Sequence, residues 1–295
     1  MAIIDPHHHL WDLSRLNYPW LGAADKTTFF GDYSALAKSY LAVDYLANSD
    51  QQKLTASVHI QAEADPSDPV AETRWLSEVA EQSGTVPSAI VAYADFTRPD
   101  IAAILEAHCH FDRVRGIRQI LNYHPDSGLS YTDENLLDNE SWHSNFSLLK
   151  KFELSFDMQI YYQQMAQAAQ LADAHPAIQI ILNHTGMPVE RDAAGIEGWR
   201  QGMARLAQCP NVAVKISGLG MCDPRWSIDS IRPFVLDTID RFGVERCMFA
   251  SNFPVDRLFS SYEHLYDAYR TIISPFSSAQ QHRLLHDNAA GFYRI

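Results

Sequence analysis

The sequence predicts one α/β domain over residues 1–295, a distorted (β/α)8 barrel with long loops after its first and fourth strands. Short β-rich runs alternate with segments of helical spacing, and polar clusters follow several of the runs. A hydrophobic content of 46% over 295 residues supplies the large core that such a barrel needs. A doubly wound sheet is the alternative fold. No Gly-x-Gly-x-x-Gly motif follows the first strand, which weighs against a dinucleotide-binding sheet.

Eight apolar runs are candidate strands: Ala2–Asp5, Thr55–Gln61, Ala89–Ala94, Val114–Leu121, Ser155–Tyr161, Ile178–Asn183, Val212–Ser217 and Cys247–Ser251. Apolar residues at helical spacing predict helices between and after them: Val70–Gln82, Ile101–His108, Met165–Ala174, Gly198–Ala207, Ile228–Phe242, Tyr262–Ile272 and Ser278–Asn288. Ser278 is the expected N-cap of the last helix. Two irregular stretches, Leu10–Asp32 and His124–Glu140, follow the first and fourth strands. In a barrel both would cover the face that carries the site.

Composition narrows the class of partner. The net charge is −13 and no basic cluster is present, so a nucleic-acid partner is not expected. No apolar run reaches the about 18 residues of a membrane helix, and no signal peptide is visible. Four scattered cysteines without a Cys-x-x-Cys pair suggest reduced thiols and a cytoplasmic protein: Cys109, Cys209, Cys222 and Cys247. A small-molecule substrate is the expected partner, and the chain could be a monomer or a homodimer.

The first ten residues contain the most informative motif, an apolar run that leads into Asp5-Pro6-His7-His8-His9. Side chains on a strand alternate between faces, so His7 and His9 are expected to point one way and His8 the other. Two imidazoles at a strand end can hold a metal ion or flank a reacting carbonyl. An expression tag is the alternative, but three histidines are few for a tag.

The second and fourth strands offer further polar side chains. His59, Gln61 and Glu63 share one face, with Glu63 nearest the mouth of the barrel, and His59 is expected to be a hydrogen-bonded interior residue. Arg115 and Arg118 fall on opposite faces of the fourth strand. Arg118, closer to the strand end, is expected to enter the barrel and to bind a carboxylate or a sugar oxygen, or else to pair with a barrel acid.

The fifth and sixth strands also end in polar residues. Asp157, Gln159 and Tyr161 share a face and are candidate polar lining residues. His184 follows an apolar strand directly and precedes Gly186 and a proline, which makes it a site candidate.

Lys215 lies inside the apolar seventh strand, where an ammonium is costly unless it is paired. We expect it to meet a buried acid or to serve the site. Asn252 and Asp256 follow the eighth strand, and Trp20 lies in the first long loop, where it could stack on a substrate or pack the loop.

Four segments in this order resemble the amidohydrolase superfamily, specifically the lactonase branch of its amidohydrolase-2 group: Asp5-Pro6-His7-His8-His9, Asn183-His184-Thr185-Gly186, Lys215-Ile216-Ser217-Gly218-Leu219 and Ser251-Asn252-Phe253-Pro254-Val255. That branch includes L-fuconolactonase, L-rhamnonolactonase and pyrone-dicarboxylate lactonase types. The resemblance covers nearly the whole chain, and it rests on the combination and order of the motifs.

The resemblance implies that His7, His9, His184 and the position of Asn252 surround the reacting centre. The family usually has Asp at that position, and a neutral Asn cannot act as a base near pH 7. Ligands for a second metal are absent, because the fourth strand offers arginines and the fifth has no histidine. The three histidines could hold one divalent metal, with Zn²⁺ the best match. Several lactonases of this branch are thought to need none, so the metal is left open.

The leading hypothesis is hydrolysis of a lactone of a sugar acid or a related carboxylate by water attack at its carbonyl. His7, His9 and Lys215 would stabilise the oxyanion and His184 would be the base. Glu63 and Asp256 are the other base candidates. The expected substrate-binding residues are Arg118, Glu63, Gln61, Tyr161, Trp20 and Asp256. Two alternatives stay open: a non-hydrolytic reaction (decarboxylase, hydratase or lactone isomerase), and a degenerate barrel that only binds.

Overall fold

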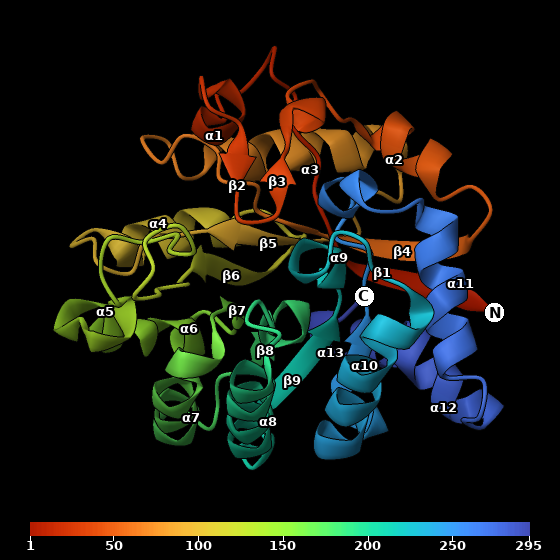
Figure 1. The fold of residues 1–295 in the computed structure, drawn as a ribbon. Coiled ribbons are helices and arrows are strands. Elements are labelled where there is room, and N and C mark those ends of the chain that lie inside the picture. Colours follow the sequence, from red (N-terminus) through yellow and green to blue (C-terminus); the bar gives the residue numbers. More distant parts are fainter.

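The computed structural model describes residues 1–295, and its centre is a parallel sheet of eight strands in the order β1-β4-β5-β6-β7-β8-β9-β10 (Figure 1). The strands are β1 Ala2–His8, β4 Lys53–Ile60, β5 Ala89–Tyr93, β6 Val114–Ile120, β7 Ser155–Gln159, β8 Ile180–Leu182, β9 Val212–Ile216 and β10 Cys247–Phe249. The sheet closes where the backbone N–H of Asn252 donates to the His7 carbonyl at 2.8 Å and that of His9 donates to the Phe253 carbonyl at 2.7 Å. The predicted barrel of eight strands is therefore confirmed.

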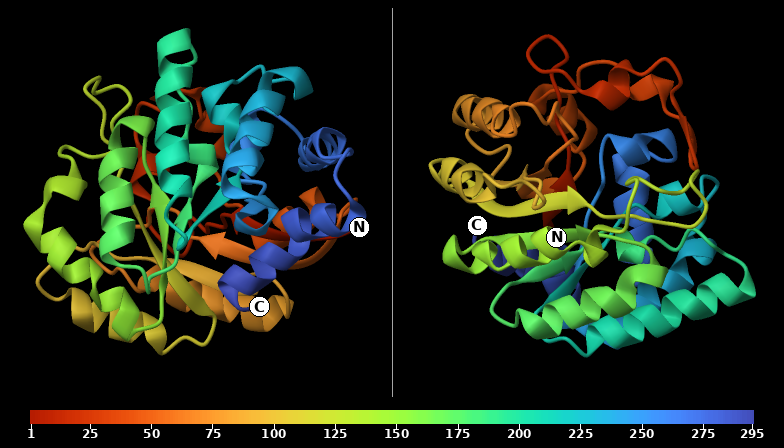
Figure 2. Two further views of the ribbon diagram at one scale, coloured as in Figure 1. Left: turned by 90° about the horizontal axis from the view of Figure 1, so that it is seen from below. Right: turned by 90° about the vertical axis from the view of Figure 1, so that its left-hand side faces the viewer.

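Helices surround the barrel (Figure 2). The α-helices are α1 Pro19–Gly22, α2 Ala42–Asn48, α3 Ala71–Ser83, α4 Ile101–Cys109, α5 Glu140–Phe146, α6 Leu148–Lys151, α7 Met165–Ala174, α8 Ala193–Ala207, α9 Leu219–Cys222, α10 Ile228–Phe242, α11 Tyr262–Ile272, α12 Ser278–His282 and α13 Asn288–Tyr293. The predicted bounds of α7, α10 and α11 are confirmed. The other predicted helices between strands are found with ends that differ from the prediction.

The C-terminal prediction needs two corrections. Ser277, not Ser278, is the N-cap, because its hydroxyl accepts from the backbone N–H of Gln280 at 3.3 Å. The predicted single helix is also divided, because a π-helical turn, Arg283–Asp287, separates α12 from α13.

The inside of the barrel contains a layer of apolar side chains from several strands. Ile4, Val58, Val91, Ile181 and Met248 are among the residues that form this cluster, and all are buried. Two residues of α13, Ala289 and Tyr293, belong to the same cluster. The last helix therefore packs against the barrel interior, and the site lies at the opposite, carboxyl ends of the strands.

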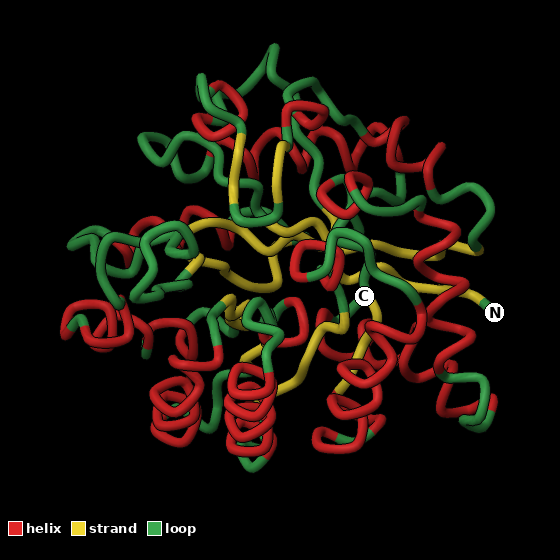
Figure 3. Tube along the Cα trace, viewed as in Figure 1, coloured by secondary structure: helices red, strands yellow, loops and turns green.

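Long connections cover those carboxyl ends (Figure 3). The stretch after β1 holds α1 and a hairpin of two short strands, β2 Thr27–Thr28 and β3 Gly31–Asp32, where only irregular chain was predicted. The stretch after β6 reaches α5 through a short 3₁₀ turn at Leu136–Asp138. No helix of the structure is both long enough and apolar enough to cross a bilayer.

Candidate active site

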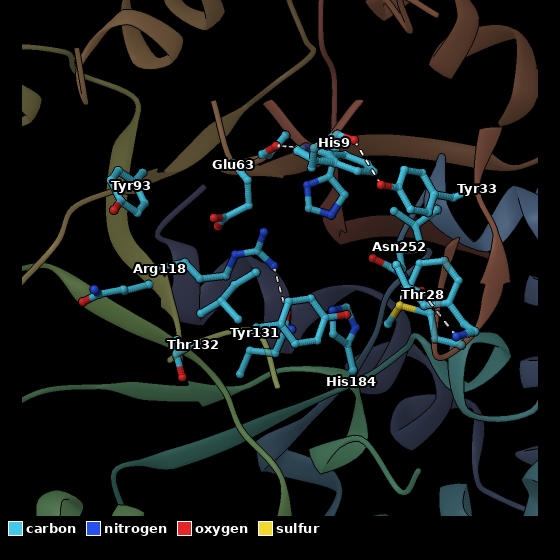
Figure 4. Close-up of a pocket in the computed structure, with 18 of the residues that line it drawn as sticks. His9, Thr28, Tyr33, Glu63, Tyr93, Arg118, Tyr131, Thr132, His184 and Asn252 are labelled. Atoms are coloured by element: carbon cyan, nitrogen blue, oxygen red, sulfur yellow. Dashed lines mark hydrogen bonds between the residues drawn. The ribbon is translucent and has the colours of Figure 1, made fainter. Parts of the chain in front are cut away.

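A cavity of about 510 Å³ opens at the carboxyl ends of the strands (Figure 4). Polar side chains from six different strand ends reach it: His9, Glu63, Arg118, Gln159, His184 and Asn252. Aromatic side chains line the rest, most of them from the two long connections: Trp11, Trp20, Phe30, Tyr33, Tyr93 and Tyr131. Because the polar residues converge from separate strands, the fold itself assembles this site.

The N-terminal histidines alternate as predicted. The ring centroids of His7 and His9 are 5.0 Å apart, and those of His7 and His184 are 4.5 Å apart. His8 points the other way, where it stacks on Tyr45 with a centroid distance of 4.1 Å. His7 is fully buried beneath the cavity and does not line it, whereas His9 and His184 do.

Hydrogen bonds fix how the two cavity imidazoles present their nitrogens. His9 Nδ1 lies 2.7 Å from the carbonyl oxygen of Ile60, which only accepts, so Nδ1 carries the proton and Nε2 keeps a lone pair. His184 Nδ1 lies 3.0 Å from the Ser217 hydroxyl. Burial is the main reason why the pKa of both imidazoles lies well below the usual 6.5, and the positive charge of Arg118 lowers it further. Both rings are therefore uncharged and available as hydrogen-bond acceptors near neutral pH.

Lys215 meets a buried acid, one of the two roles predicted for it. Its ammonium pairs with the carboxylate of Asp157, and both side chains are fully buried. The Lys215 Nζ also lies 3.4 Å from His7 Nδ1, and burial lowers the pKa of Lys215 to about 8. An ammonium that donates to Nδ1 leaves the His7 proton on Nε2, an atom with no partner in the protein. His7 is thus set up as a hydrogen-bond donor.

Arg118, and not Arg115, enters the barrel, and it is 3% exposed. Its guanidinium donates to Gln159 Oε1 at 3.2 Å and to the Gln61 carbonyl, while its Nε has no partner. Arg115 instead bonds backbone carbonyls such as that of Asp112 at the opposite end of the strand. One free donor of Arg118 is therefore available close to the cavity.

Glu63 lies at the mouth in a left-handed conformation, with φ 57°. Gln61 holds it there, since the backbone N–H of Glu63 donates to Gln61 Oε1 at 2.7 Å and the Gln61 amide donates to the Glu63 carboxylate. Gln61 itself is buried outside the cavity lining, so it supports Glu63 and does not face a bound molecule.

Asn252 lines the cavity with φ 57°, and Asp256 lies behind it outside the lining. Burial raises the pKa of the Asp256 carboxyl to about 7, against the lowering effect of the Asn252 side chain and of the N–H groups of Gly218 and Gly220. The position that the family usually fills with an acid is therefore an amide with a buried carboxyl directly beneath it.

Three further predicted residues have different placements. Trp20 lines the cavity. Tyr161 does not, because its hydroxyl donates to the Leu129 carbonyl at 2.7 Å and its ring packs in a small apolar cluster with Met187. His59 is an interior residue as predicted, with Nε2 3.1 Å from the Leu10 carbonyl.

The sequence did not single out five aromatic lining residues: Trp11, Phe30, Tyr33, Tyr93 and Tyr131. The density of aromatic residues in the first long loop was the available signal, but it does not say which rings face a cavity. That depends on how the hairpin β2–β3 folds back over the strand ends.

The divalent metal that the family implies can be compared with the donor set. The ligand atoms of His7, His9 and His184 do not all lie within 4.8 Å of one another; the cluster that meets this condition is His282, His286 and Asp287, at the end of α12 and in the π-helical turn after it. The His7 Nε2 carries a proton, and Lys215 and Arg118 add positive charge nearby. No carboxylate replaces the amide of Asn252. The residues present therefore do not form a closed site for one divalent ion.

Comparison with known proteins agrees with this fold. A Sinorhizobium fredii protein, y4mH, is 48% identical over 100% of this chain and 99% of its own length. An L-fucono-1,5-lactonase of Burkholderia multivorans is 27% identical over 99% of this chain and 96% of its own. A crystal structure of a Burkholderia multivorans amidohydrolase with bound zinc covers 100% of both chains with a TM-score of 0.82 at 25% identity. The profile of the amidohydrolase family, described as Amidohydrolase, matches residues 4–295, and this chain belongs to that family.

Proposed function

We propose that the protein is a lactonase that opens a small cyclic ester by attack of water on the carbonyl. The observation that supports it most is the pair of buried, uncharged imidazoles, His9 and His184, which line one cavity with Arg118 and Asn252. A general base needs a free lone pair near working pH, and ester carbonyls need donors where negative charge develops. The lactonase relative at 27% identity supports the same reaction class.

The steps use residues of this chain alone. Arg118 Nε and the Asn252 amide donate to the carbonyl oxygen. The buried His7 ring does not reach the substrate and packs against the rings of His9 and His184. His184 takes a proton from the attacking water as the carbon–oxygen bond forms. The ring carbon–oxygen bond then breaks, and the imidazolium returns the proton to the leaving oxygen. The product is a hydroxy acid, which releases one proton to solvent.

Lys215 and Asp157 act indirectly in this scheme, through His7. Their pair holds the His7 ring and its proton in place, because the ammonium donates to Nδ1. No resident metal ion is required, since the donors and the base are all side chains. Glu63 binds a polar group of the substrate at the mouth.

One observation favours a different reaction in the same cavity. Asn252 cannot accept a proton from water, so a lactone isomerisation or another non-hydrolytic reaction would suit this position equally well. Hydrolysis releases a proton and isomerisation does not. The two are distinguished by following proton release and product chemistry with the same lactone.

The first test is a panel of γ- and δ-lactones followed by pH-stat titration, with untagged protein and with His184→Asn. We expect stoichiometric acid release by the wild type and a loss of about 10²- to 10⁴-fold in kcat/KM in the variant, because it lacks the base. His9→Asn is the variant to compare with His184→Asn, because the His9 imidazole also presents a free lone pair to the cavity. Unchanged turnover in His184→Asn would remove His184 from the mechanism.

Metal dependence is tested in parallel. We expect untagged protein treated with EDTA and dialysed to retain its lactonase rate, and added Zn²⁺ not to raise it. A rate that disappears with chelator and returns with stoichiometric Zn²⁺ would show that a metal, and not the side chains alone, activates the substrate.

A further inference from the structure

We propose that the cavity contains an apolar subsite and that the substrate is a lactone with an alkyl or aryl substituent, rather than a polyhydroxylated sugar lactone. This inference rests on the proposed lactonase function and names its substrate class. It concerns the part of the cavity lined by the first long connection, where Tyr33 is labelled in Figure 4.

Four aromatic residues of this connection line the cavity beside Thr28 and are here called the aromatic wall: Trp11, Trp20, Phe30 and Tyr33. The rings form a continuous chain, with centroid distances of 5.5 Å from Trp11 to Trp20, 5.5 Å from Trp20 to Tyr33 and 6.4 Å from Tyr33 to Phe30. Trp11 and Tyr33 are almost fully buried. Such a packed chain presents a fixed surface and not a set of mobile side chains.

The polar atoms of the aromatic wall are used inside the protein. Trp11 Nε1 donates to the Lys38 carbonyl at 2.7 Å, and Trp20 Nε1 donates to the Ala62 carbonyl at 2.9 Å. The Tyr33 hydroxyl donates to the Trp20 carbonyl at 3.1 Å, and phenylalanine has no polar atom. The wall therefore offers a bound molecule only carbon surface, although three of its four side chains carry a donor.

The wall cannot form hydrogen bonds with the hydroxyl groups of a sugar. Sugar hydroxyls that enter a cavity must exchange water for protein donors and acceptors, or they lose hydrogen bonds. The four rings provide no such partners, whereas Thr28, Glu63, Arg118 and Gln159 elsewhere in the lining do. The cavity thus fits a molecule with one polar, reactive end and one apolar end.

In this proposal the two ends of the substrate contact different residues. The ester lies against His184, Arg118 and Asn252, and the substituent points toward the aromatic wall. A cavity of about 510 Å³ is within the range of sites for drug-sized ligands, so a substituent of several carbons can be accommodated beside the ring.

The test compares δ-valerolactones with methyl, propyl, pentyl and phenyl substituents against a hydroxylated aldono-δ-lactone. We expect kcat/KM to rise by roughly three- to fourfold for each added methylene until the wall is covered, as apolar burial predicts. The aldonolactone should be the poorest substrate. The inference is overturned if kcat/KM does not change with alkyl length, or if the aldonolactone is the preferred substrate.

Phe30→Ala and Phe29→Ala are a matched pair, because these neighbours lie at the same hairpin turn and only Phe30 lines the cavity. In Phe30→Ala, kcat/KM should no longer rise with the length of the alkyl substituent, whereas in Phe29→Ala it should still rise. Phe30→Leu keeps an apolar side chain and should restore most of the increase in kcat/KM with alkyl length. Equal effects of Phe30→Ala and Phe29→Ala in folded proteins contradict a role for the wall.

Binding of the corresponding lactams, measured by calorimetry, separates the two proposals. Lactams that bind more tightly with longer alkyl groups, while no lactone is opened, support the apolar subsite and refute the lactonase. Lactones opened at equal rates whatever the substituent support the lactonase and refute the subsite.

Discussion

Asn252 illustrates how single residues are held at strand ends in this site. It has φ 57°, and Glu63 and His184 have similar left-handed backbones, with φ of 57° and 54°. Such conformations cost about 1–3 kcal/mol each in non-glycine residues, although Asn tolerates them best. Three residues that line one cavity share this strain, so the backbone at the site is held by its surroundings and not by local preference.

Replacing Asn252 by Asp tests whether the site has lost an acid. The new carboxylate would lie against the buried Asp256, and ionising two adjacent carboxyl groups is unfavourable because their negative charges repel. We expect Asn252→Asp to lower the free energy of unfolding by about 1–3 kcal/mol without raising kcat/KM. Denaturant unfolding and the lactone assay measure both. A gain of activity would favour the view that the natural chain is a binding-only barrel.

Gly116 shows what an element requires of its residues. A Cβ at this position of β6 would meet the Ser155 side chain and lie 2.9 Å from the Ser155 carbonyl oxygen on β7. The two strands are paired there, so the backbone cannot move apart freely. We expect Gly116→Ala to destabilise the protein by about 1–3 kcal/mol in denaturant unfolding.

The control for this change lies in α13. Gly291 has open space around its Cβ position and an ordinary helical backbone. Gly291→Ala should be neutral or should stabilise by up to about 1 kcal/mol, because alanine favours the helix. If both changes cost the same, crowding between β6 and β7 is not the cause.

A second element-level effect depends on pH. Burial raises the pKa of Glu72, in the first turn of α3, to about 8, although the Ala62 N–H and the Tyr18 hydroxyl donate to it. Its unfolded pKa is near 4.5. Between these values the native state holds a proton that the unfolded state has lost. The contribution of Glu72 to stability is thus complete below pH 4.5 and is lost as pH rises through about 8.

Glu72→Gln removes this titration and keeps one acceptor oxygen. We expect the melting temperature of the variant, relative to the wild type, to increase steadily from pH 5 to pH 8.5. Differential scanning calorimetry at several pH values measures the difference. A constant difference across this range would mean that Glu72 does not change its protonation there.

Long amphipathic segments were predictable and short ones were not. The bounds of α10 and α11 follow from helical periodicity and from Ser227 and Ser261 at their N-caps. Helix α2 has seven residues, and each strand of the β2–β3 hairpin has two, so neither leaves a periodic pattern. The same limit hid the aromatic wall, because tertiary folding of that hairpin decides which rings face inward.

At the scale of the whole molecule, the last helix is linked to the chemistry at the far end of the barrel. The Tyr293 hydroxyl donates to the Asp157 carboxylate at 2.9 Å, Asp157 pairs with Lys215, and Lys215 contacts His7. Strand-end histidines were visible in the sequence, but this chain of contacts was not. It joins residues far apart in sequence through the barrel interior.

Tyr293→Phe removes one donor from a buried charged group. We expect a loss of about 1–3 kcal/mol in the free energy of unfolding, and a smaller proportional change in kcat/KM, because Lys215 still holds Asp157. Denaturant unfolding and the lactone assay report the two quantities. A variant as stable as the wild type would show that Asp157 does not need the hydroxyl.

The aromatic wall comes entirely from one continuous stretch, Trp11 to Tyr33. Most of the polar residues that line the cavity come from later strand ends. The residues of the wall thus form one block of the sequence, whereas the polar residues of the strand ends lie on both sides of it, with His7 and His9 just before it and the others after it. A relative could acquire a new substrate by exchanging about two dozen codons near its start, while the residues that open the ring stay unchanged.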